Sequence, residues 1–316
     1  MTPPLRARVL EAAGPLIDRC SFPSPGAPIA CAVSGGADSL ALLMLAVAAG
    51  CDVVAHHVDH GLREGSDQDV HVVNELAAGL GVEVVVHKVV IAAGPNLESR
   101  ARSARFGALP EGAATGHTAD DQAETVLLNL LRGAATDGLA AMRLGHRHPI
   151  LALRRSETHA LCLQLQLSPV EDPTNRDPAY LRNRIRHELI PVLCELADRD
   201  IVPIIARQAR LLADDAELLT RLSRALDPTD ARAIAQAPAA LGRRALRDWL
   251  RCGHPPDLAT VERVLSVAAG ETLAADVGSG RSVRRSKGRL RLEPARAQLT
   301  GEQLPGCLSC SPGVPG

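Results

Sequence analysis

The first half of the chain alternates short apolar runs with longer segments in which apolar residues recur at helical spacing. The short runs are typical of buried strands and the longer segments of helices. Strands are predicted at Pro28–Val33, Asp52–His57, Val82–Lys88 and Ala113–Gly116. Helices are predicted at Leu5–Arg19, Asp38–Leu45, Asp67–Leu80, Leu97–Leu109 and Ala119–Arg132. This repeated strand–helix–strand order predicts an α/β fold, with a parallel sheet covered by helices on both faces.

The second half is mainly helical in its periodicity. Helices are predicted at Tyr180–Ala197, Ile201–Leu226, Ala239–Arg251 and Asp257–Ala268, and a short hairpin within Thr272–Leu292 that turns at Lys287-Gly288. We therefore predict an N-terminal helix and linker (1–28), a parallel-sheet domain (29–190), connecting helices (191–230), a smaller, mostly helical domain (231–302) and a Pro/Gly/Cys-rich tail (303–316).

The first predicted strand ends in a Ser-Gly-Gly turn that leads directly into an apolar helix at Asp38. In parallel sheets, ligands bind beyond the carboxyl ends of the strands. Glycines allow a tight turn there, and the N-terminus of a helix favours a bound anion. The turn therefore predicts a phosphate cradle at Ser34–Ser39, the alternative being an ordinary turn capped by Asp38. It is not a Walker A loop, because no lysine follows the glycines.

Polar residues also follow the second and fourth predicted strands. Asp59, His60 and Arg63 are interpreted as contacts to a nucleotide, its magnesium ion or the second substrate, and a metal site in this His-rich stretch is the alternative. His117, Asp121 and Glu124 share one face if the next helix begins at the turn. Two carboxylates and a histidine can bind an ammonium group and remove its proton.

Several arginines are candidates for contacts to phosphate or to RNA. These are Arg102, Arg105, Arg132, Arg182, Arg184 and Arg186. Arginine suits bidentate contacts to phosphate. For Arg132 the alternative is a residue that complements the dipole at the end of its helix, and for the other five it is a solvated helix surface with local ion pairs. On a helix, Arg182 and Arg186 align and Arg184 points elsewhere. For Asp121 the alternative is a capping box with Thr118.

Composition narrows the class of partner. The chain has 316 residues, a formal net charge of −1 and only four aromatic residues, so platforms for base stacking are not expected. An RNA partner is therefore expected to be held through its phosphates and its shape.

The eight cysteines show no regular framework, which favours a reduced, cytoplasmic protein. No apolar run is long enough to cross a membrane.

Eight motifs occur in order along the chain, and together they are more specific for a protein family than any single motif. They are Ser34-Gly35-Gly36-Ala37-Asp38-Ser39, His57-Val58-Asp59-His60-Gly61-Leu62-Arg63, Glu98-x-x-Ala101-Arg102-x-x-Arg105-Phe106, Gly116-His117-x-x-Asp120-Asp121-Gln122-x-Glu124-Thr125, Arg132-Gly133, Gly138-Leu139, Asp172-Pro173-Thr174-Asn175 and Arg182-Asn183-Arg184-Ile185-Arg186. The set resembles the tRNA(Ile)-lysidine synthetases, which are PP-loop ATP pyrophosphatases with a Rossmann-like sheet. The resemblance covers about Ile29 to Pro191.

The resemblance implies that ATP adenylates C2 of the wobble cytidine in a tRNA(Ile) with a CAU anticodon, and that free L-lysine then displaces AMP. Under it, Ser34, Gly35, Gly36, Ala37, Asp38 and Ser39 bind ATP together with Asp59, His60 and Arg63. Asp38 also contacts Mg²⁺. Asp38, His117, Asp121 and Glu124 are catalytic, the six arginines contact substrate or tRNA, and the domain at 231–302 contributes a tRNA contact.

Two other functions compete with this hypothesis. A PP-loop tRNA thiolase, acting on a cytidine or uridine, also adenylates a base but generally needs paired cysteines near its active site. Here Cys31 lies in a predicted strand, and Cys307 and Cys310 lie in the tail. A non-catalytic ATP- or tRNA-binding module is the second alternative, and the combined set of acidic, basic and cradle residues argues against it.

Overall fold

The computed structural model describes residues 3–59, 66–89, 100, 104, 106–170 and 172–294. The chain divides into two compact units, Met1–Ala216 and Glu217–Gly316. The finer division into segments 1–28, 29–190, 191–230, 231–302 and 303–316 stays a prediction.

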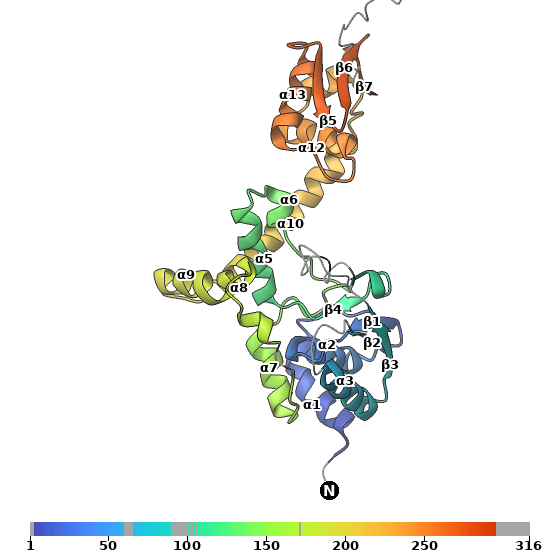
Figure 1. Ribbon diagram of the computed structural model, residues 1–316, viewed down its shortest axis with the longest axis vertical. Helices are drawn as coiled ribbons and strands as arrows, with labels where there is room; N and C mark the ends of the chain where they lie inside the picture. Colours follow the sequence, from blue (N-terminus) through green and yellow to red (C-terminus); the bar gives the residue numbers. More distant parts are fainter. Residues whose placement is uncertain are drawn as a thin grey trace, which may run out of the picture. The chain divides into compact units, whose positions relative to one another are not determined.

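The first unit is built on a parallel sheet of four strands in the order β3-β2-β1-β4. The strands are β1 (Pro28–Ala32), β2 (Asp52–Asp59), β3 (Glu83–Lys88) and β4 (Ala114–Thr115). In the register, Cys31 of β1 lies opposite Ala55 of β2 and Ala114 of β4. All four strands were predicted from the sequence, and the predicted α/β fold class is confirmed (Figure 1).

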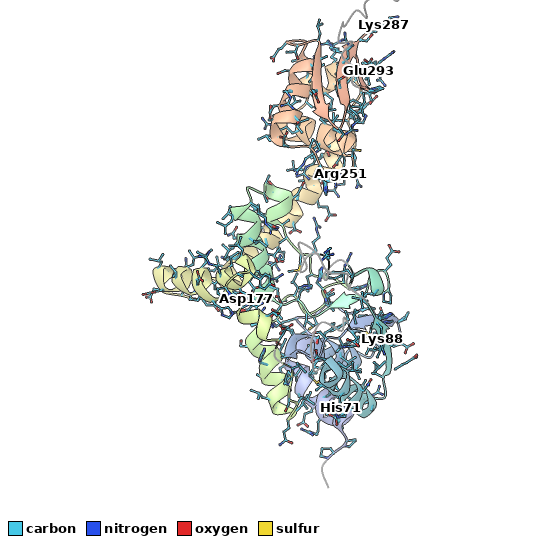
Figure 2. The ribbon with its side chains drawn as sticks, in the orientation of Figure 1. His71, Lys88, Asp177, Arg251, Lys287 and Glu293 are labelled. Atoms are coloured by element: carbon cyan, nitrogen blue, oxygen red, sulfur yellow. The ribbon has the colours of Figure 1, made fainter. Side chains whose placement is uncertain are left out.

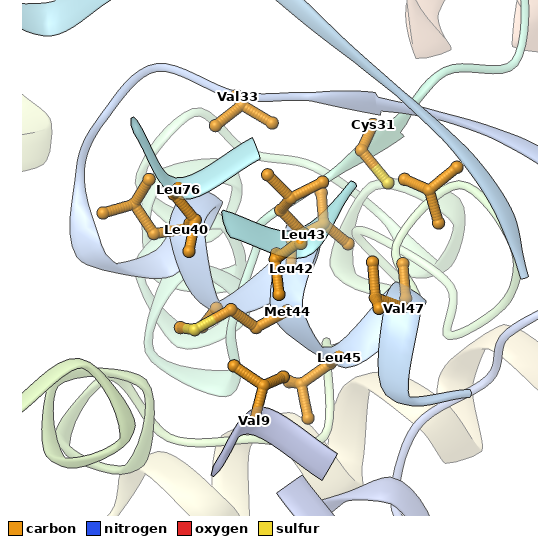
Figure 3. Close-up of a cluster of buried hydrophobic side chains, with 14 of the residues drawn as sticks. Val9, Cys31, Val33, Leu40, Leu42, Leu43, Met44, Leu45, Val47 and Leu76 are labelled. Carbon is orange, nitrogen blue, oxygen red and sulfur yellow. The ribbon is translucent and has the colours of Figure 1, made fainter. Parts of the chain in front are cut away.

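The core of this unit is organised around helix α2 (Ala37–Ala48), which is apolar on every side and therefore buried. Leu40, Leu43 and Met44 are fully enclosed, and Val9 of helix α1 (Leu5–Ile17) and Leu76 of helix α3 (Ser66–Leu80) lie in the same cluster (Figure 3). Burial of this helix fixes its N-terminus at the carboxyl end of β1. The predicted phosphate cradle is therefore held on a rigid element.

Beyond β4 the unit is mainly helical. The helices are α5 (Ala119–Leu131), α6 (Thr136–Leu139), α7 (Arg155–Gln164), α8 (Leu181–Arg184), α9 (Ile190–Ala197) and α10 (Val202–Ser223), with a 3-10 turn η1 (Pro173–Arg176) and a π-helical turn η2 (Ile185–Leu189). Helix α7 was not predicted. The single helix predicted over 180–197 contains η2, which ends at Leu189, two residues before Pro191. Proline has no N–H with which to continue the α-helical hydrogen bonds.

The second unit pairs three helices with a small antiparallel sheet. The elements are α11 (Ala231–Gln236), α12 (Ala239–Leu250), α13 (Leu258–Ala269), β5 (Ala274–Gly278), β6 (Arg281–Ser286) and β7 (Arg289–Pro294). Ile234, Leu246, Val264 and Val283 form part of their shared core. The predicted hairpin is confirmed at Lys287-Gly288, both of which have positive φ. Helix α11 and strand β5 were not predicted. Across the residues described, no helix has the length and apolar character required to span a bilayer.

Candidate active site

The cradle is closed by hydrogen bonds among its own residues. The backbone N–H of Ser34 donates to Oγ of Ser39 at 3.0 Å, and that hydroxyl donates to the carbonyl of Gly36 at 2.8 Å. Gly35 has a φ of +87°, which side chains rarely tolerate. Helix α2 begins at Ala37, so its N-terminus opens onto this loop. Tight turn and helix end together make an anion-binding geometry.

The fourth strand approaches the cradle closely at Gly116. A Cβ on this residue would lie 2.6 Å from the carbonyl oxygen of Asp38, in the first turn of α2. Only glycine permits that approach. The contact places the motif after β4 directly beside the start of α2, as the predicted meeting of strand ends requires.

The carboxylate of Asp38 connects α2 to α7. It accepts a short hydrogen bond from the hydroxyl of Thr158, and its Oδ2 lies 3.4 Å from Nε of Arg155. Burial raises the pKa of Asp38, and the neighbouring charge of Asp121 adds to the rise, which the contacts to Thr158 and Arg155 only partly oppose. A further cation placed beside Asp38 would therefore stabilise its ionised form.

Asp121 and Glu124 of α5 are surrounded by three arginines from later segments. Arg155 of α7 donates to Asp121 at 3.0 Å and to Glu124 at 3.1 Å. Arg182 of α8 also contacts both, at 3.0 Å and 2.8 Å. Arg186 of η2 donates to Glu124 at 2.6 Å and 3.1 Å. We call these five side chains the acid–arginine cluster.

The charges of this cluster stabilise one another. Burial would raise the pKa of Asp121, but the charges of Arg155 and Arg182 outweigh it and hold that pKa at about 2. Burial alone would lower the pKa of Arg155, but Asp121 and Glu124 raise it instead. The Glu124 side chain is only 1% exposed. Asp121 is therefore ionised at neutral pH, and both carboxylates of the cluster are buried.

His117 approaches this cluster from the strand side. It lies two residues before the first residue of α5, so the helical periodicity used in the sequence prediction does not apply to it. Its charge nevertheless lowers the pKa of Asp121. Asp121 also accepts a hydrogen bond from the backbone N–H of Thr118 at 3.0 Å. Asp121 therefore caps the start of α5 and also belongs to the acid–arginine cluster.

Some predicted residues lie away from the cluster or outside the described residues. Arg132 is exposed at the end of α5, and Arg184 pairs with Glu188 at 3.1 Å on the surface, as its helical position predicted. Asp59 is the last residue of β2. The remaining predictions fall on residues the structure does not describe: His60, Arg63, Arg102 and Arg105.

Two residues of the site were missed by the sequence analysis, Arg155 and Thr158. The available signal was weak, namely an Arg154-Arg155 pair at the start of a short helical pattern. Arg154 holds this helix end in place, with its guanidinium 3.0 Å and 3.1 Å from the carboxylate of Asp120. The backbone N–H of Arg155 donates to the same carboxylate at 2.8 Å.

The described residues give no sign of a preformed metal cage. Within them, no group of three or more His, Cys, Asp or Glu side chains is arranged to hold a metal ion. His57 is buried with its Nδ1 2.8 Å from the carbonyl of Val33, and His56 stacks on His87. A magnesium ion bound with a nucleotide needs only one or two carboxylates besides the phosphates. Asp38 fits that requirement, because it lies beside the cradle and the contacts to Thr158 and Arg155 stabilise its ionised form only in part.

The two buried cysteines in the described part of the chain do not suit sulfur chemistry. Burial raises the pKa of Cys31 and of Cys162 to about 12, so neither forms a thiolate readily. All six cysteines in the described part of the chain are free thiols. Cys307 and Cys310 lie outside the described residues.

Comparison with known proteins agrees with the geometry. A family model described as the PP-loop domain matches residues 12–193. The tRNA(Ile)-lysidine synthase of Rhodococcus erythropolis is 41% identical over 245 residues, covering 72% of this chain and 75% of that one. The tRNA(Ile)-lysidine synthase of Mycobacterium bovis is 35% identical over 300 residues, covering 85% of this chain and 91% of that one.

The acid–arginine cluster predicts a large effect of Glu124→Gln on stability. The change leaves three partly buried guanidinium groups with one buried carboxylate fewer, and breaking a buried ion pair costs about 3 kcal/mol or more. We expect the free energy of unfolding of the first unit to fall by that amount. Urea unfolding followed by far-UV circular dichroism measures it, because the single tryptophan, Trp249, lies in the second unit.

Glu188→Gln is the matched control. Glu188 pairs with Arg184 in an exposed ion pair, and such pairs contribute about 0.5 kcal/mol. Equal destabilisation by the two variants would show that the cluster does not depend on its buried carboxylate.

Proposed function

The chain belongs to the tRNA(Ile)-lysidine synthase family of PP-loop proteins, and on this premise we propose that it joins lysine to the wobble cytidine of a tRNA(Ile) with a CAU anticodon. ATP is the activating substrate and AMP and pyrophosphate are the products. The enzyme is then a ligase that forms a carbon–nitrogen bond. The product pairs with A in place of G, which changes the amino-acid identity of the tRNA from methionine to isoleucine.

One observation carries this proposal. The guanidinium of Arg155 contacts all three predicted catalytic carboxylates, with atoms 3.4 Å from Asp38, 3.0 Å from Asp121 and 3.1 Å from Glu124. The cradle end of α2 and the acidic face of α5 are thereby joined in one site. ATP bound at the cradle and an amine bound at the acidic face are neighbours in such a site.

In the first step, the C2 oxygen of the cytidine attacks the α-phosphorus of ATP and pyrophosphate leaves. Ser34, Gly35, Gly36 and Ser39, with the start of α2 at Ala37, hold the pyrophosphate moiety through backbone N–H groups and hydroxyls. Asp59, His60 and Arg63 complete the nucleotide contacts. Asp38 helps to hold Mg²⁺, which neutralises phosphate charge when it is bound.

In the second step, the lysine side-chain nitrogen attacks C2 and the C2–oxygen bond to AMP breaks. The amine enters as an ammonium ion, which suits the negative charge of Asp38, Asp121 and Glu124. His117 is the residue of this group that can take up its proton at neutral pH. Arg182 and Arg186 orient the carboxylates, and Arg102, Arg105, Arg132 and Arg184 remain candidates for contacts to tRNA phosphate.

Sulfur transfer is the competing function. A thiolase needs reactive cysteines near the adenylated base, and burial suppresses the thiolates of Cys31 and Cys162. The ligation proposal needs no cysteine. A cytoplasmic location follows as part of the same proposal, because tRNA, ATP and free lysine are the substrates.

The second unit supplies a basic surface for the tRNA. Between 281 and 291, six of the eleven residues are Lys or Arg and none is acidic. Arg284 of β6 lies directly opposite Arg291 of β7, although like charges in opposed positions destabilise a sheet. Lys287 occupies the turn between the two strands, and Glu293 of β7 reaches only to 4.0 Å from Arg284 (Figure 2). An anionic RNA backbone compensates this repulsion.

We predict that Arg284→Ala with Arg291→Ala weakens binding of all tRNAs by a similar factor. Loss of two phosphate contacts lowers the salt slope of binding by about 2. Filter binding at several salt concentrations measures the slope. Arg243→Ala is the control, because Arg243 of α12 is paired with Glu262 at 2.5 Å. An unchanged slope in the double variant would contradict a phosphate-binding role for this face.

The function itself is tested with ATP, labelled lysine and transcripts of tRNA(Ile) with a CAU anticodon. We expect one lysine incorporated for each AMP and each pyrophosphate released, with tRNA(Met) a poorer substrate. Asp38→Asn abolishes incorporation, because it removes a cradle carboxylate, whereas Cys307→Ser with Cys310→Ser leaves it intact. Pyrophosphate release with another RNA and no lysine incorporation would sink the proposal.

A further inference from the structure

The hydroxyl of Thr115 lies between two histidine rings at the end of β4. Its Oγ1 is 2.6 Å from Nδ1 of His117 and 2.8 Å from Nδ1 of His148. The rings meet edge to face, with centroids 5.1 Å apart. The same hydroxyl lies 3.2 Å from the carbonyl oxygen of Arg147, and Thr115 is 7% exposed. Nothing in the motifs of the sequence indicated this arrangement.

The number of protons available for these hydrogen bonds restricts the tautomer of His117. A hydroxyl has one proton to donate and two lone pairs that accept. All three contacts of Thr115 are hydrogen bonds only if its proton points to the carbonyl of Arg147 and both rings donate N–H groups to Oγ1. In that arrangement, the proton of neutral His117 is on Nδ1. Its other ring nitrogen, Nε2, is then the basic atom.

We propose that Thr115, braced by His148, is a positioning residue that fixes the tautomer of His117 so that Nε2 takes the proton of the incoming lysine ammonium. The proposal rests on the ligation function and adds two residues to it. One N–H bond of the ammonium breaks and an Nε2–H bond forms. The electron pair stays on the lysine nitrogen, which becomes the nucleophile, and His117 becomes an imidazolium that still donates to Thr115.

The surrounding charges favour this proton transfer. Asp121 of α5 is ionised, and its charge interacts favourably with a charge on His117, so it stabilises the imidazolium. Burial lowers the pKa of His148, and the charge of Arg147 lowers it further. His148 therefore stays neutral beside the charged ring. A neutral His148 keeps its hydrogen bond to Thr115 without repelling His117.

Thr115→Val tests the proposal, because valine keeps the shape of threonine and removes the hydroxyl. In full-length protein with ¹⁵N-labelled histidine, we expect His117 to show the Nδ1–H tautomer in the parent and a mixture in the variant. The His117→Gln variant assigns its signal. Lysine transfer should slow by about tenfold to a hundredfold in kcat, with little change in the KM for lysine. Thr115→Ser, which restores a hydroxyl, should restore both tautomer and rate.

The step that is affected separates this role from a structural one. Pyrophosphate release in a single turnover without lysine should be unchanged in Thr115→Val, since adenylation does not use His117 as a base. An unchanged tautomer in Thr115→Val, or an equal loss in Thr115→Ser, would overturn the proposal.

If Thr115→Val does not fold, His148→Asn provides the second test, because its amide still donates to Thr115 and the tautomer should persist. If the parent transfers no lysine, the ligation function fails, whereas the tautomer measurement still judges the role of Thr115.

Discussion

The site depends on one guanidinium that pairs with three carboxylates. Arg155 brings together Asp38 from the start of α2 with Asp121 and Glu124 from α5. Without such a cation, three carboxylates this close and this buried could not all stay ionised. Arg182 adds a second positive charge, and together with Arg155 it holds the pKa of Asp121 low, so this buried carboxylate keeps its negative charge. The chemistry proposed here requires that charge.

Rigid elements hold these charges in position. Helix α2 is fixed by its fully buried leucines, and Gly116 lets the end of β4 lie against its first turn. Arg154 and Asp120 anchor the start of α7, so the neighbouring Arg155 is oriented before substrate arrives. Preorganised charge of this kind lowers a barrier without a cost of rearrangement during the reaction. The two proposed steps, adenylation and ligation, can thus share one sheet edge.

Local patterns in the sequence predicted the sheet, the turn between β1 and α2, and the helix that carries Asp121 and Glu124, because each is a local element. They failed where the structure depends on distant pairs. Arg155 lies 117 positions from Asp38, and no periodicity connects them. The same holds for Thr115 and His148, which are 33 positions apart. The π-helical turn before Pro191 was missed since it differs from an α-helix only in its hydrogen bonds.

The most direct test of the central claim follows the oxygen at C2 of the wobble cytidine. A tRNA(Ile) carrying ¹⁸O at that one position is incubated with the protein, ATP and lysine, and the released AMP is analysed by mass spectrometry. Adenylation at this oxygen predicts one ¹⁸O atom in the phosphate of AMP for each lysine joined. AMP without ¹⁸O, in a reaction that still joins lysine, would contradict the account.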